Sequence, residues 1–196
     1  MLALKTKIHF ATSHPNKLKE FMSIVGNKLP NYEFVQAPID LVEIQGEPQQ
    51  IAKEKCKTAA KMLYPVITED VSLCFNAWKG LPGPYVKSFL GKVGCDGIWD
   101  MIASFPDKTA YAQCIYAIAF SPADEPKLFV GAVDGKIVKP RGDKNFGKAA
   151  GWDAIFEPKG KTLTFGEMEE SEKNEISHRS LAVSKLINFL AGYKPT

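Results

Sequence analysis

The fold of this chain is decided around one stretch, Tyr64-Pro65-Val66-Ile67-Thr68-Glu69-Asp70. Its first five residues have the density of β-branched and aromatic side chains that is typical of a short buried strand, and two acids follow at once. In open α/β sheets, ligands collect in the crevice beyond the carboxyl ends of the strands. The stretch therefore predicts a strand that ends at Glu69-Asp70 and presents acidic groups to a ligand.

The sequence on both sides of this stretch alternates expected strands with expected helices. Runs of β-branched and aromatic residues predict strands at residues 7–12, 34–41, 64–68, 111–120 and 128–138. Apolar residues at helical spacing predict helices from 15 to either 26 or 29, and at 48–63, 97–105 and 177–190. This order is typical of a mixed α/β fold with an elongated central sheet.

Local sequence adds three expectations. The buried face of the first helix is expected to comprise Leu18, Phe21, Met22 and Val25. Asp134-Gly135 indicates a bulge or bend inside a strand rather than its end. Residues 139–165 are rich in Gly, Pro and Lys and are expected to form loops.

Composition limits the class of protein. The chain has 196 residues, of which 45% are apolar and 24% charged, which is enough to bury a substantial core without disulfides or metal. We expect a single domain over residues 1–196. The four cysteines are far apart and lack a Cys-x-x-Cys pair, so we expect buried thiols in a reducing compartment. They are Cys56, Cys74, Cys95 and Cys114.

Charge and hydropathy argue against two classes of partner. The formal net charge is only +3, and the sequence has no block of five or more basic residues, so a nucleic-acid groove is not expected. No apolar run is long enough for a signal peptide or a membrane-spanning helix. We expect a cytoplasmic protein that binds a small molecule.

Two carboxylates are candidates for a magnesium site. Mg²⁺ takes one or two protein carboxylates and leaves its other positions to water and phosphate oxygens, and Glu43 and Asp70 are the pair we expect. Adjacent side chains on a strand point to opposite faces, so Glu69 and Asp70 would not both reach one ion. One would hold metal or a water, and the other would orient or cap. The alternative is that they are a turn acid and a solvent-facing acid.

Three lysines follow turns or lie among apolar positions. Lys17 lies in the first turn after a strand-to-helix crossing, where backbone N–H groups and the helix dipole favour an anion. Lys55 lies among apolar positions of the second helix, and Lys87 closes a loop rich in Gly and Pro. Each alone is typical of a solvated lysine, but together with a metal ion they would neutralise a triphosphate.

Arginine is scarce, since Arg141 and Arg179 are the only two in the chain. Arg179 follows Ser177 and His178 at the start of the last expected helix, where Ser177 can cap but a cation opposes the helix dipole. A guanidinium beside an imidazole suits hydrogen bonding to a carbonyl oxygen on a base edge. The alternative is an exposed arginine beside a surface histidine.

Two aromatic residues, Phe146 and Trp152, lie in the polar region expected to form loops. Aromatic side chains in such a place either stack on a purine or cover the edge of the core. The sequence leaves these two interpretations equally open.

Seven segments occur in one order along the chain. They are Thr12-Ser13-His14-Pro15-Asn16-Lys17-Leu18-Lys19-Glu20, Gln45-Gly46-Glu47-Pro48, Glu69-Asp70, Leu73-Cys74-Phe75-Asn76-Ala77, Gly80-Leu81-Pro82-Gly83-Pro84-Tyr85, Gly151-Trp152-Asp153, and Glu172-Lys173-Asn174 with Ser177-His178-Arg179. That order closely resembles the inosine triphosphate pyrophosphatase family, the noncanonical purine triphosphate pyrophosphatases, in its eukaryotic form. The resemblance spans almost the whole chain.

The resemblance implies a fold and a site. The fold would be an elongated mixed sheet flanked by helices, with two α/β lobes and the nucleotide in the cleft between them, usually as a homodimer. Glu43 and Asp70 would bind Mg²⁺, for which Mn²⁺ could substitute. Asp70 would also be the base for the attacking water, with Glu69 and Lys17 in the catalytic group. The implied phosphate-binding residues are Thr12, Ser13, His14, Asn16, Lys17, Lys55 and Lys87. The implied base-binding residues are Phe146 and Trp152, as stacking aromatics, and Asp153, Lys173, His178 and Arg179, as readers of the purine edge.

The implied reaction is hydrolysis of a noncanonical purine nucleoside triphosphate (ITP, dITP or XTP) to the monophosphate and pyrophosphate. The competing class is a nucleotide-binding module without turnover, and a further alternative is a pyrophosphatase for pyrimidine or modified bases. The chain departs from the family pattern in three places. His14 and Val71 replace an Asn and a Ser or Thr, and the family's Phe-Gly-Trp-Asp run is opened between Phe146 and Trp152.

Overall fold

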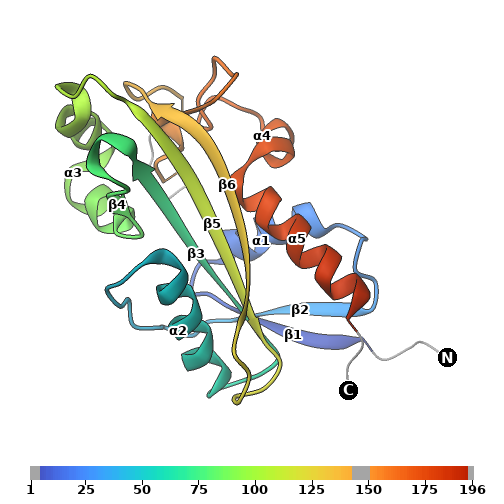
Figure 1. The fold of residues 1–196 in the computed structure, drawn as a ribbon. Helices are drawn as coiled ribbons and strands as arrows, with labels where there is room; N and C mark the ends of the chain where they lie inside the picture. Colours follow the sequence, from blue (N-terminus) through green and yellow to red (C-terminus); the bar gives the residue numbers. More distant parts are fainter. Residues whose placement is uncertain (1–4, 143–150, 194–196) are drawn as a thin grey trace. The chain divides into compact units, whose positions relative to one another are not determined.

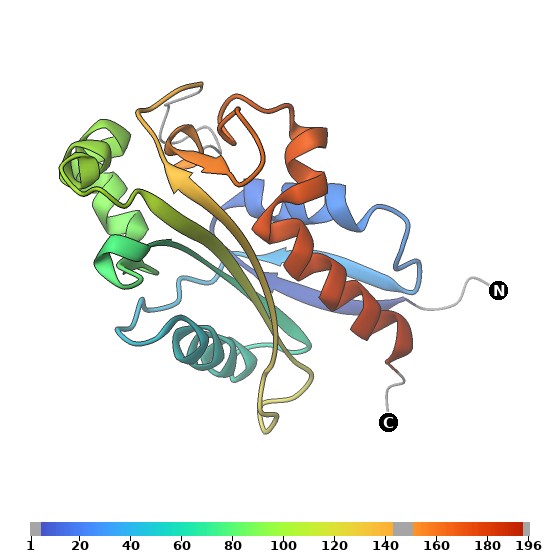
Figure 2. The ribbon, with the colours of Figure 1, turned by 45° about the horizontal axis from the view of Figure 1, so that its top comes forward.

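The computed structural model describes residues 5–142 and 151–193. Within these residues a seven-stranded sheet is flanked by five α-helices (Figures 1 and 2), which confirms the expected α/β class. The strands are β1 (Thr6–Ala11), β2 (Tyr32–Ala37), β3 (Val66–Phe75), β4 (Pro82–Gly83), β5 (Thr109–Ala119), β6 (Lys127–Ile137) and β7 (Phe156–Pro158). The helices are α1 (Pro15–Val25), α2 (Pro48–Ala60), α3 (Val86–Ala103), α4 (Glu170–Ile176) and α5 (His178–Gly192), with short 3-10 turns at Asn76–Trp78 and Asp153–Ile155.

The sheet is mixed, with strand order β2-β1-β3-β5-β6-β7 and with β4 paired to β3. β1 runs parallel to both β2 and β3, whereas β4 pairs antiparallel with β3 and β7 antiparallel with β6. In the register of β1 with β3, Phe10 lies opposite Ile67. Continued by two residues, that register brings Thr12 to the level of Glu69. The turn after β1 is thereby placed beside the two acids of β3.

The chain divides into two compact units. Unit 1 takes its residues from 1–70, 114–131 and 179–196, and unit 2 from 71–113 and 132–178. On β3 the boundary falls between Asp70 and Val71. A single domain, two lobes and a cleft all remain predictions.

The sheet of unit 1 carries helices on both faces (Figure 2). On one face, Phe21 of α1 packs against Phe10 and Tyr116, with ring centroids 5.2 and 5.6 Å apart. On the other face, α2 buries small side chains such as Ala59 against Val66 of β3. α5 lies on the same side as α1, and an ion pair joins these two helices.

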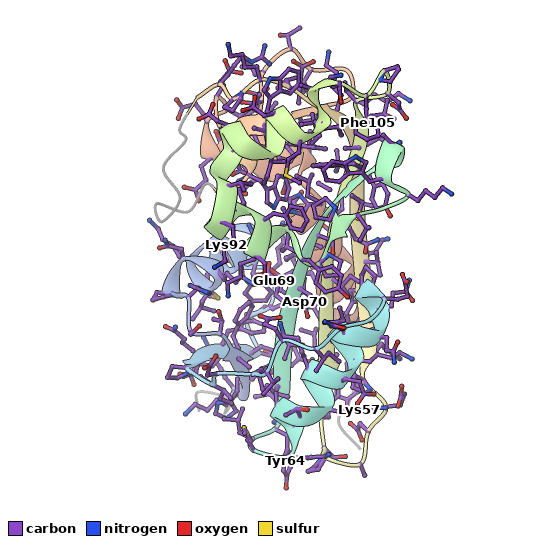
Figure 3. The ribbon with its side chains drawn as sticks, turned by 90° about the vertical axis from the view of Figure 1, so that its left-hand side faces the viewer. Lys57, Tyr64, Glu69, Asp70, Lys92 and Phe105 are labelled. Carbon is purple, nitrogen blue, oxygen red and sulfur yellow. The ribbon has the colours of Figure 1, made fainter. Side chains whose placement is uncertain are left out.

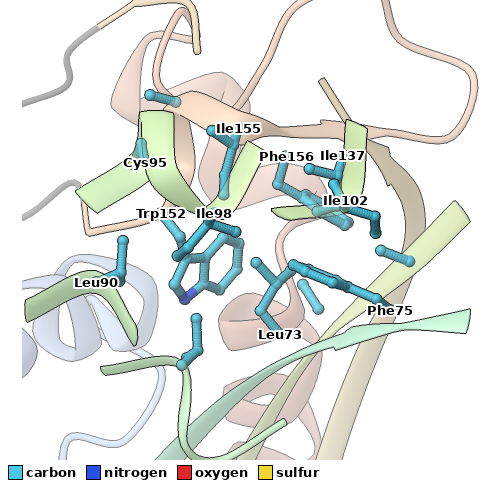
Figure 4. Packing of buried hydrophobic residues seen from close by; sticks show 14 of the residues in the cluster. Leu73, Phe75, Leu90, Cys95, Ile98, Ile102, Ile137, Trp152, Ile155 and Phe156 are labelled. Atoms are coloured by element: carbon cyan, nitrogen blue, oxygen red, sulfur yellow. The ribbon is translucent and has the colours of Figure 1, made fainter. Parts of the chain in front are cut away.

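Unit 2 has its own apolar core (Figure 4). Leu73 and Phe75 of β3, Ile98 and Ile102 of α3, and Trp152 form part of this buried cluster. Burying large apolar side chains on strand and helix together is the main source of its stability, at about 1.5–3 kcal/mol each. Val71, which departs from the family pattern, packs against this cluster, so its apolar side chain has a structural role.

The expectation that the strand ends at Glu69-Asp70 is wrong. β3 continues to Phe75, because Leu73 and Cys74 pair with β4 and extend the ladder beyond the acids. The two acids therefore lie within a strand rather than after it.

Other expected elements also differ in detail. Met22 of α1 is 40% exposed and Ile24 is buried instead. α3 begins at Val86 rather than at Gly97, and the non-helical φ of 65° at Gly94 marks a kink that hides the longer helix from periodicity. Sequence patterns did not predict α4 or β7, which are only seven and three residues long.

Asp134-Gly135 lies inside β6, as expected, and the strand continues to Ile137. A Cβ atom on Gly135 would lie 2.5 Å from the Glu157 carbonyl oxygen and 2.6 Å from Cζ of Phe156. Only glycine therefore lets β7 approach β6 this closely.

Two compositional expectations can be compared with the structure. All four cysteines are buried and free, as expected. In the part of the chain that the structure describes, no helix has the length and apolarity needed to cross a bilayer.

Candidate functional site

Glu69 and Asp70 are adjacent residues of β3 (Figure 3), and they contact different cations. Adjacent strand residues point to opposite faces, and Glu69 is buried while Asp70 is half-buried. Glu69 contacts cations from α1 and α5, whereas Asp70 contacts Lys55 of α2. α2 covers one face of the sheet, and α1 and α5 cover the other. Each acid therefore forms its ion pairs with the helices on its own face.

Glu69 is the centre of a buried polar network, which we call the Glu69 network. Its Oε1 accepts hydrogen bonds from Arg179 Nε at 2.7 Å and from the Tyr116 hydroxyl at 2.9 Å. The Sγ of Cys114 lies 3.6 Å from the same oxygen. Lys17 Nζ lies 3.2 Å from Oε2 as an ion pair, although outside hydrogen-bond geometry. Arg179 Nη1 also pairs with Glu20 of α1, the sixth member of the network.

These contacts keep the charge on Glu69. Burial raises the pKa of a carboxyl, but the charges of Arg179 and Lys17 outweigh burial and hold the pKa of Glu69 well below its ordinary value. Burial and the Glu69 charge raise the pKa values of Tyr116 and Cys114 well above their ordinary values, so both remain protonated donors. The carboxylate is therefore anionic, with its charge directed to protein cations.

On α2, Lys55 joins the two carboxylates expected to bind metal. Its Nζ lies 2.9 Å from Asp70 Oδ1 and 3.1 Å from Glu43 Oε2. The Lys55 and Asp70 side chains are only 11% and 13% exposed, whereas that of Glu43 is 63% exposed. Burial lowers the pKa of Lys55, but the charges of Asp70 and Glu43 outweigh it, so its pKa lies above the ordinary value. The predicted metal pair thus converges on a single cationic atom.

The donors of Glu43 and Asp70 suit a hard divalent cation. Among the described residues, Asp70 Oδ2 is buried and accepts no hydrogen bond, so one carboxylate oxygen is still available to a ligand. Burial raises the pKa of Asp70, and the charge of Lys55 opposes that shift only in part. Residues 5–142 and 151–193 contain no group of three or more His, Cys, Asp or Glu side chains placed to hold a metal. A cation held here would have two protein carboxylates, as is usual for Mg²⁺.

The turn between β1 and α1 has the features of an anion site. The backbone N–H of His14 donates to the Thr12 hydroxyl at 3.0 Å, which fixes the turn. Pro15 starts α1, the first turn of the helix carries no acid, and the N-cap residue His14 makes no side-chain capping bond. No acid of the first turn therefore offsets the positive end of the helix dipole. Ser13 and Asn16 are exposed beside it.

Four of the predicted base-binding residues belong to unit 2. They are Trp152, Asp153, Lys173 and His178. Trp152 is only 6% exposed, and its ring centroid lies 5.3 Å from that of His178 and 5.7 Å from that of Phe156. Lys173 forms an ion pair with Asp153. The indole thus belongs to the core, in agreement with the second interpretation of this aromatic, and its stacking on a base remains a prediction.

Three further predicted residues have other surroundings. Lys87 is the second residue of α3 and is exposed. Arg179 lies in unit 1, where its guanidinium is committed to Glu69 and Glu20, and its reading of a purine edge remains a prediction. Phe146 lies outside the described residues.

Sequence reasoning missed three members of the Glu69 network, Glu20, Cys114 and Tyr116. A signal existed for each of them. Glu20 follows Lys17 by three residues and therefore lies on the same helix face. Cys114 and Tyr116 alternate along a buried strand, where a tyrosine hydroxyl needs a polar partner.

Known proteins resemble this chain in sequence and in fold. The family model described as "Ham1 family" matches residues 8–189. The chain is 48% identical over 184 residues to a Giardia intestinalis protein named inosine triphosphate pyrophosphatase, covering 92% of this chain and 91% of that protein. It is 44% identical over 185 residues to a Neurospora crassa protein of the same name, covering 94% and 92%.

Two solved structures are similar along nearly the whole chain. The HAM1 protein from Coxiella burnetii superposes with a TM-score of 0.84 at 25% identity, covering 96% of this chain and 100% of that one. The Staphylococcus aureus Ham1 protein gives a TM-score of 0.77 at 26% identity, with the same coverage. Because the family model covers residues 8–189, the chain belongs to the Ham1 family.

Proposed function

We propose that this protein hydrolyses noncanonical purine nucleoside triphosphates, such as ITP, dITP and XTP, to the nucleoside monophosphate and pyrophosphate, and so cleanses the nucleotide pool. The observation that carries this proposal is the similarity to two relatives named inosine triphosphate pyrophosphatase along more than nine tenths of this chain. The arrangement of carboxylates and lysines in unit 1 supports the same reaction.

The phosphates are assigned to unit 1 residues and Lys87. The start of α1, whose first turn carries no acid, would bind phosphate oxygens through backbone N–H groups of the turn from Thr12 to Asn16. Lys17, which is 31% exposed, and Lys55 would add positive charge. Phosphoryl transfer places charge on the phosphate oxygens, so fixed donors and cations supply most of the acceleration.

Glu43 and Asp70 are the residues that would hold Mg²⁺, or Mn²⁺ in its place. When bound, the cation supplies neutralisation of charge on the phosphate oxygens. Asp70 would also accept a proton from the attacking water, through the carboxylate oxygen that has no hydrogen bond among the described residues. Glu69 would act indirectly, because its charge is held by Arg179, Tyr116 and Lys17.

Base selection is assigned to Trp152, Asp153, Lys173, His178 and Arg179, with Phe146 as a second stacking residue. The 6-keto oxygen of hypoxanthine or xanthine accepts hydrogen bonds, whereas the amino group of adenine donates them. ATP would leave buried donors unpaired, and such mismatches give strong discrimination. A panel of triphosphates ranked by kcat/KM would also test the alternative of pyrimidine or modified-base substrates.

The experiment that tests the function is release of pyrophosphate from ITP in the presence of Mg²⁺. We expect the wild type to turn over ITP and Asp70→Asn to lower kcat by at least about 100-fold. Asp124→Asn should leave kcat unchanged. Asp124 is a suitable control because its carboxylate closes a turn by accepting hydrogen bonds from Phe120 and Ser121. EDTA should stop the reaction and added Mg²⁺ or Mn²⁺ should restore it. Tight ITP binding without product would instead support a nucleotide-binding module.

A homodimer, by resemblance to the family, and a cytoplasmic location, expected from the isolated cysteines and the hydropathy of the sequence, complete the proposal. Sedimentation equilibrium of the purified protein would test the first, and imaging of a tagged chain would test the second. A monomer at micromolar concentration would contradict the dimer.

A further inference from the structure

Lys55 occupies the point on which the predicted metal pair converges. Its ammonium lies 2.9 Å from Asp70 Oδ1 and 3.1 Å from Glu43 Oε2, and its side chain is 11% exposed. Other lysines of α2 have different partners, since Lys53 and Lys57 pair with the exposed Glu125. Lys55 alone among these three neutralises both carboxylates of the proposed metal site.

An ammonium and a divalent cation cannot both bind the same carboxylate oxygens at their preferred distances. Mg²⁺ needs oxygen ligands at about 2.0–2.1 Å in octahedral geometry. The Lys55 ammonium holds its oxygens at hydrogen-bond distance, and it repels a second cation placed between them. Asp70 Oδ2 is open to a ligand, but a divalent cation that takes Asp70 Oδ1 or Glu43 Oε2 requires that this ammonium move away from that carboxylate.

We propose that Lys55 is a resident counter-ion of the metal site, which a divalent cation displaces from at least one of Glu43 and Asp70. The inference deepens the proposed function and rests on its metal site. It also reconciles two assignments of Lys55, because the displaced ammonium becomes available to a phosphate group. The resulting link between cation and phosphate binding is reciprocal, so each would strengthen the binding of the other.

The test uses Mn²⁺ alone as the probe, on the intact nucleotide-free protein, with free Mn²⁺ measured by electron paramagnetic resonance. Lys55→Met keeps the length and apolar stem of the side chain but removes its charge. We expect Lys55→Met to bind Mn²⁺ about tenfold more tightly than the wild type, the size of one lost charge-assisted hydrogen bond. Lys53→Met is the matched control on the same helix and should leave Mn²⁺ affinity unchanged.

Two further variants test whether any change in Mn²⁺ affinity comes from the Lys55 charge and from this site. Lys55→Gln, a neutral polar substitute, should also tighten Mn²⁺ binding if the methionine variant fails to fold. Adding Asp70→Asn to either variant should abolish the gain, which assigns it to this site. Unchanged or weaker Mn²⁺ binding in both Lys55 variants would overturn the inference, and so would a gain that survives Asp70→Asn.

The result is independent of turnover. If pyrophosphate is not released from ITP but Lys55→Met still binds Mn²⁺ more tightly through Asp70, the proposed reaction fails and the counter-ion role stands. If turnover is present but Mn²⁺ affinity does not rise, the reaction stands and the counter-ion role fails.

Discussion

Replacing Glu69 with glutamine tests whether the core of unit 1 depends on one buried negative charge. The Glu69 side chain is 1% exposed and contacts Arg179, Tyr116 and Lys17. Glutamine has nearly the same shape but no charge, so the packing of the site is retained. The variant therefore isolates the electrostatic part of the network.

The expected loss follows from the partners that remain. Removing one member of a buried ion pair costs about 3–5 kcal/mol, because the other charge is left without compensation. We expect the lower end, about 3 kcal/mol, since Arg179 keeps Glu20 and Lys17 is partly hydrated. For a chain of this size, that loss lowers Tm by roughly 6–12 °C.

The pH dependence gives an independent check. The pKa of Glu69 in the folded protein lies below its ordinary value of 4.5, because the charges of Arg179 and Lys17 outweigh the effect of burial. A carboxylate with a lowered folded-state pKa stabilises the fold fully above its unfolded value, and this stabilisation is lost as the pH falls. The stability difference between wild type and Glu69→Gln should therefore be largest near neutral pH and shrink below pH 4.5.

Urea unfolding at several pH values measures both effects. The control is Glu125→Gln, which removes an exposed carboxylate paired with Lys53 and Lys57 and should change stability by less than about 0.5 kcal/mol. A Glu69→Gln protein as stable as this control would refute the reasoning. So would a stability difference that does not narrow in acid, because the charge of Glu69 would then not be its source.

Three other substitutions test one hydrogen bond to Glu69 and the space at two glycines of unit 2. Tyr116→Phe removes one donor to Glu69 and should lower the free energy of unfolding by about 0.5–1.5 kcal/mol, measured by urea denaturation; an unchanged stability would show that the hydrogen bond contributes nothing. Gly135→Ala places a methyl group 2.5 Å from the Glu157 carbonyl oxygen and should cost about 1–3 kcal/mol in a thermal melt. Gly91→Ala, where α3 leaves open space, should instead stabilise by roughly 0.5–1 kcal/mol, and equal effects at both glycines would contradict the packing argument.

Much of the fold could be predicted because local signals agreed with one another. Proline at position 15, followed by apolar residues at helical spacing, places α1, and β-branched runs place β1, β5 and β6 within one or two residues. Signals failed where tertiary pairing decided the outcome. β3 continues past two acids because β4 pairs with it, and α3 continues past Gly94 because both of its halves are buried in unit 2.

For the candidate site, the sequence by itself determined the residue types. The charged residues of the site can be identified from the sequence, and so can the family resemblance that links them. They are the carboxylates at 43, 69 and 70, the lysines at 17 and 55, and the arginine at 179. What only the tertiary structure decided is which charges meet. Glu69 is committed to Arg179 and Lys17, while Asp70 shares Lys55 with Glu43. The physical reason is that strand alternation sends neighbouring acids to opposite faces, and the helix covering each face determines which cation each acid contacts.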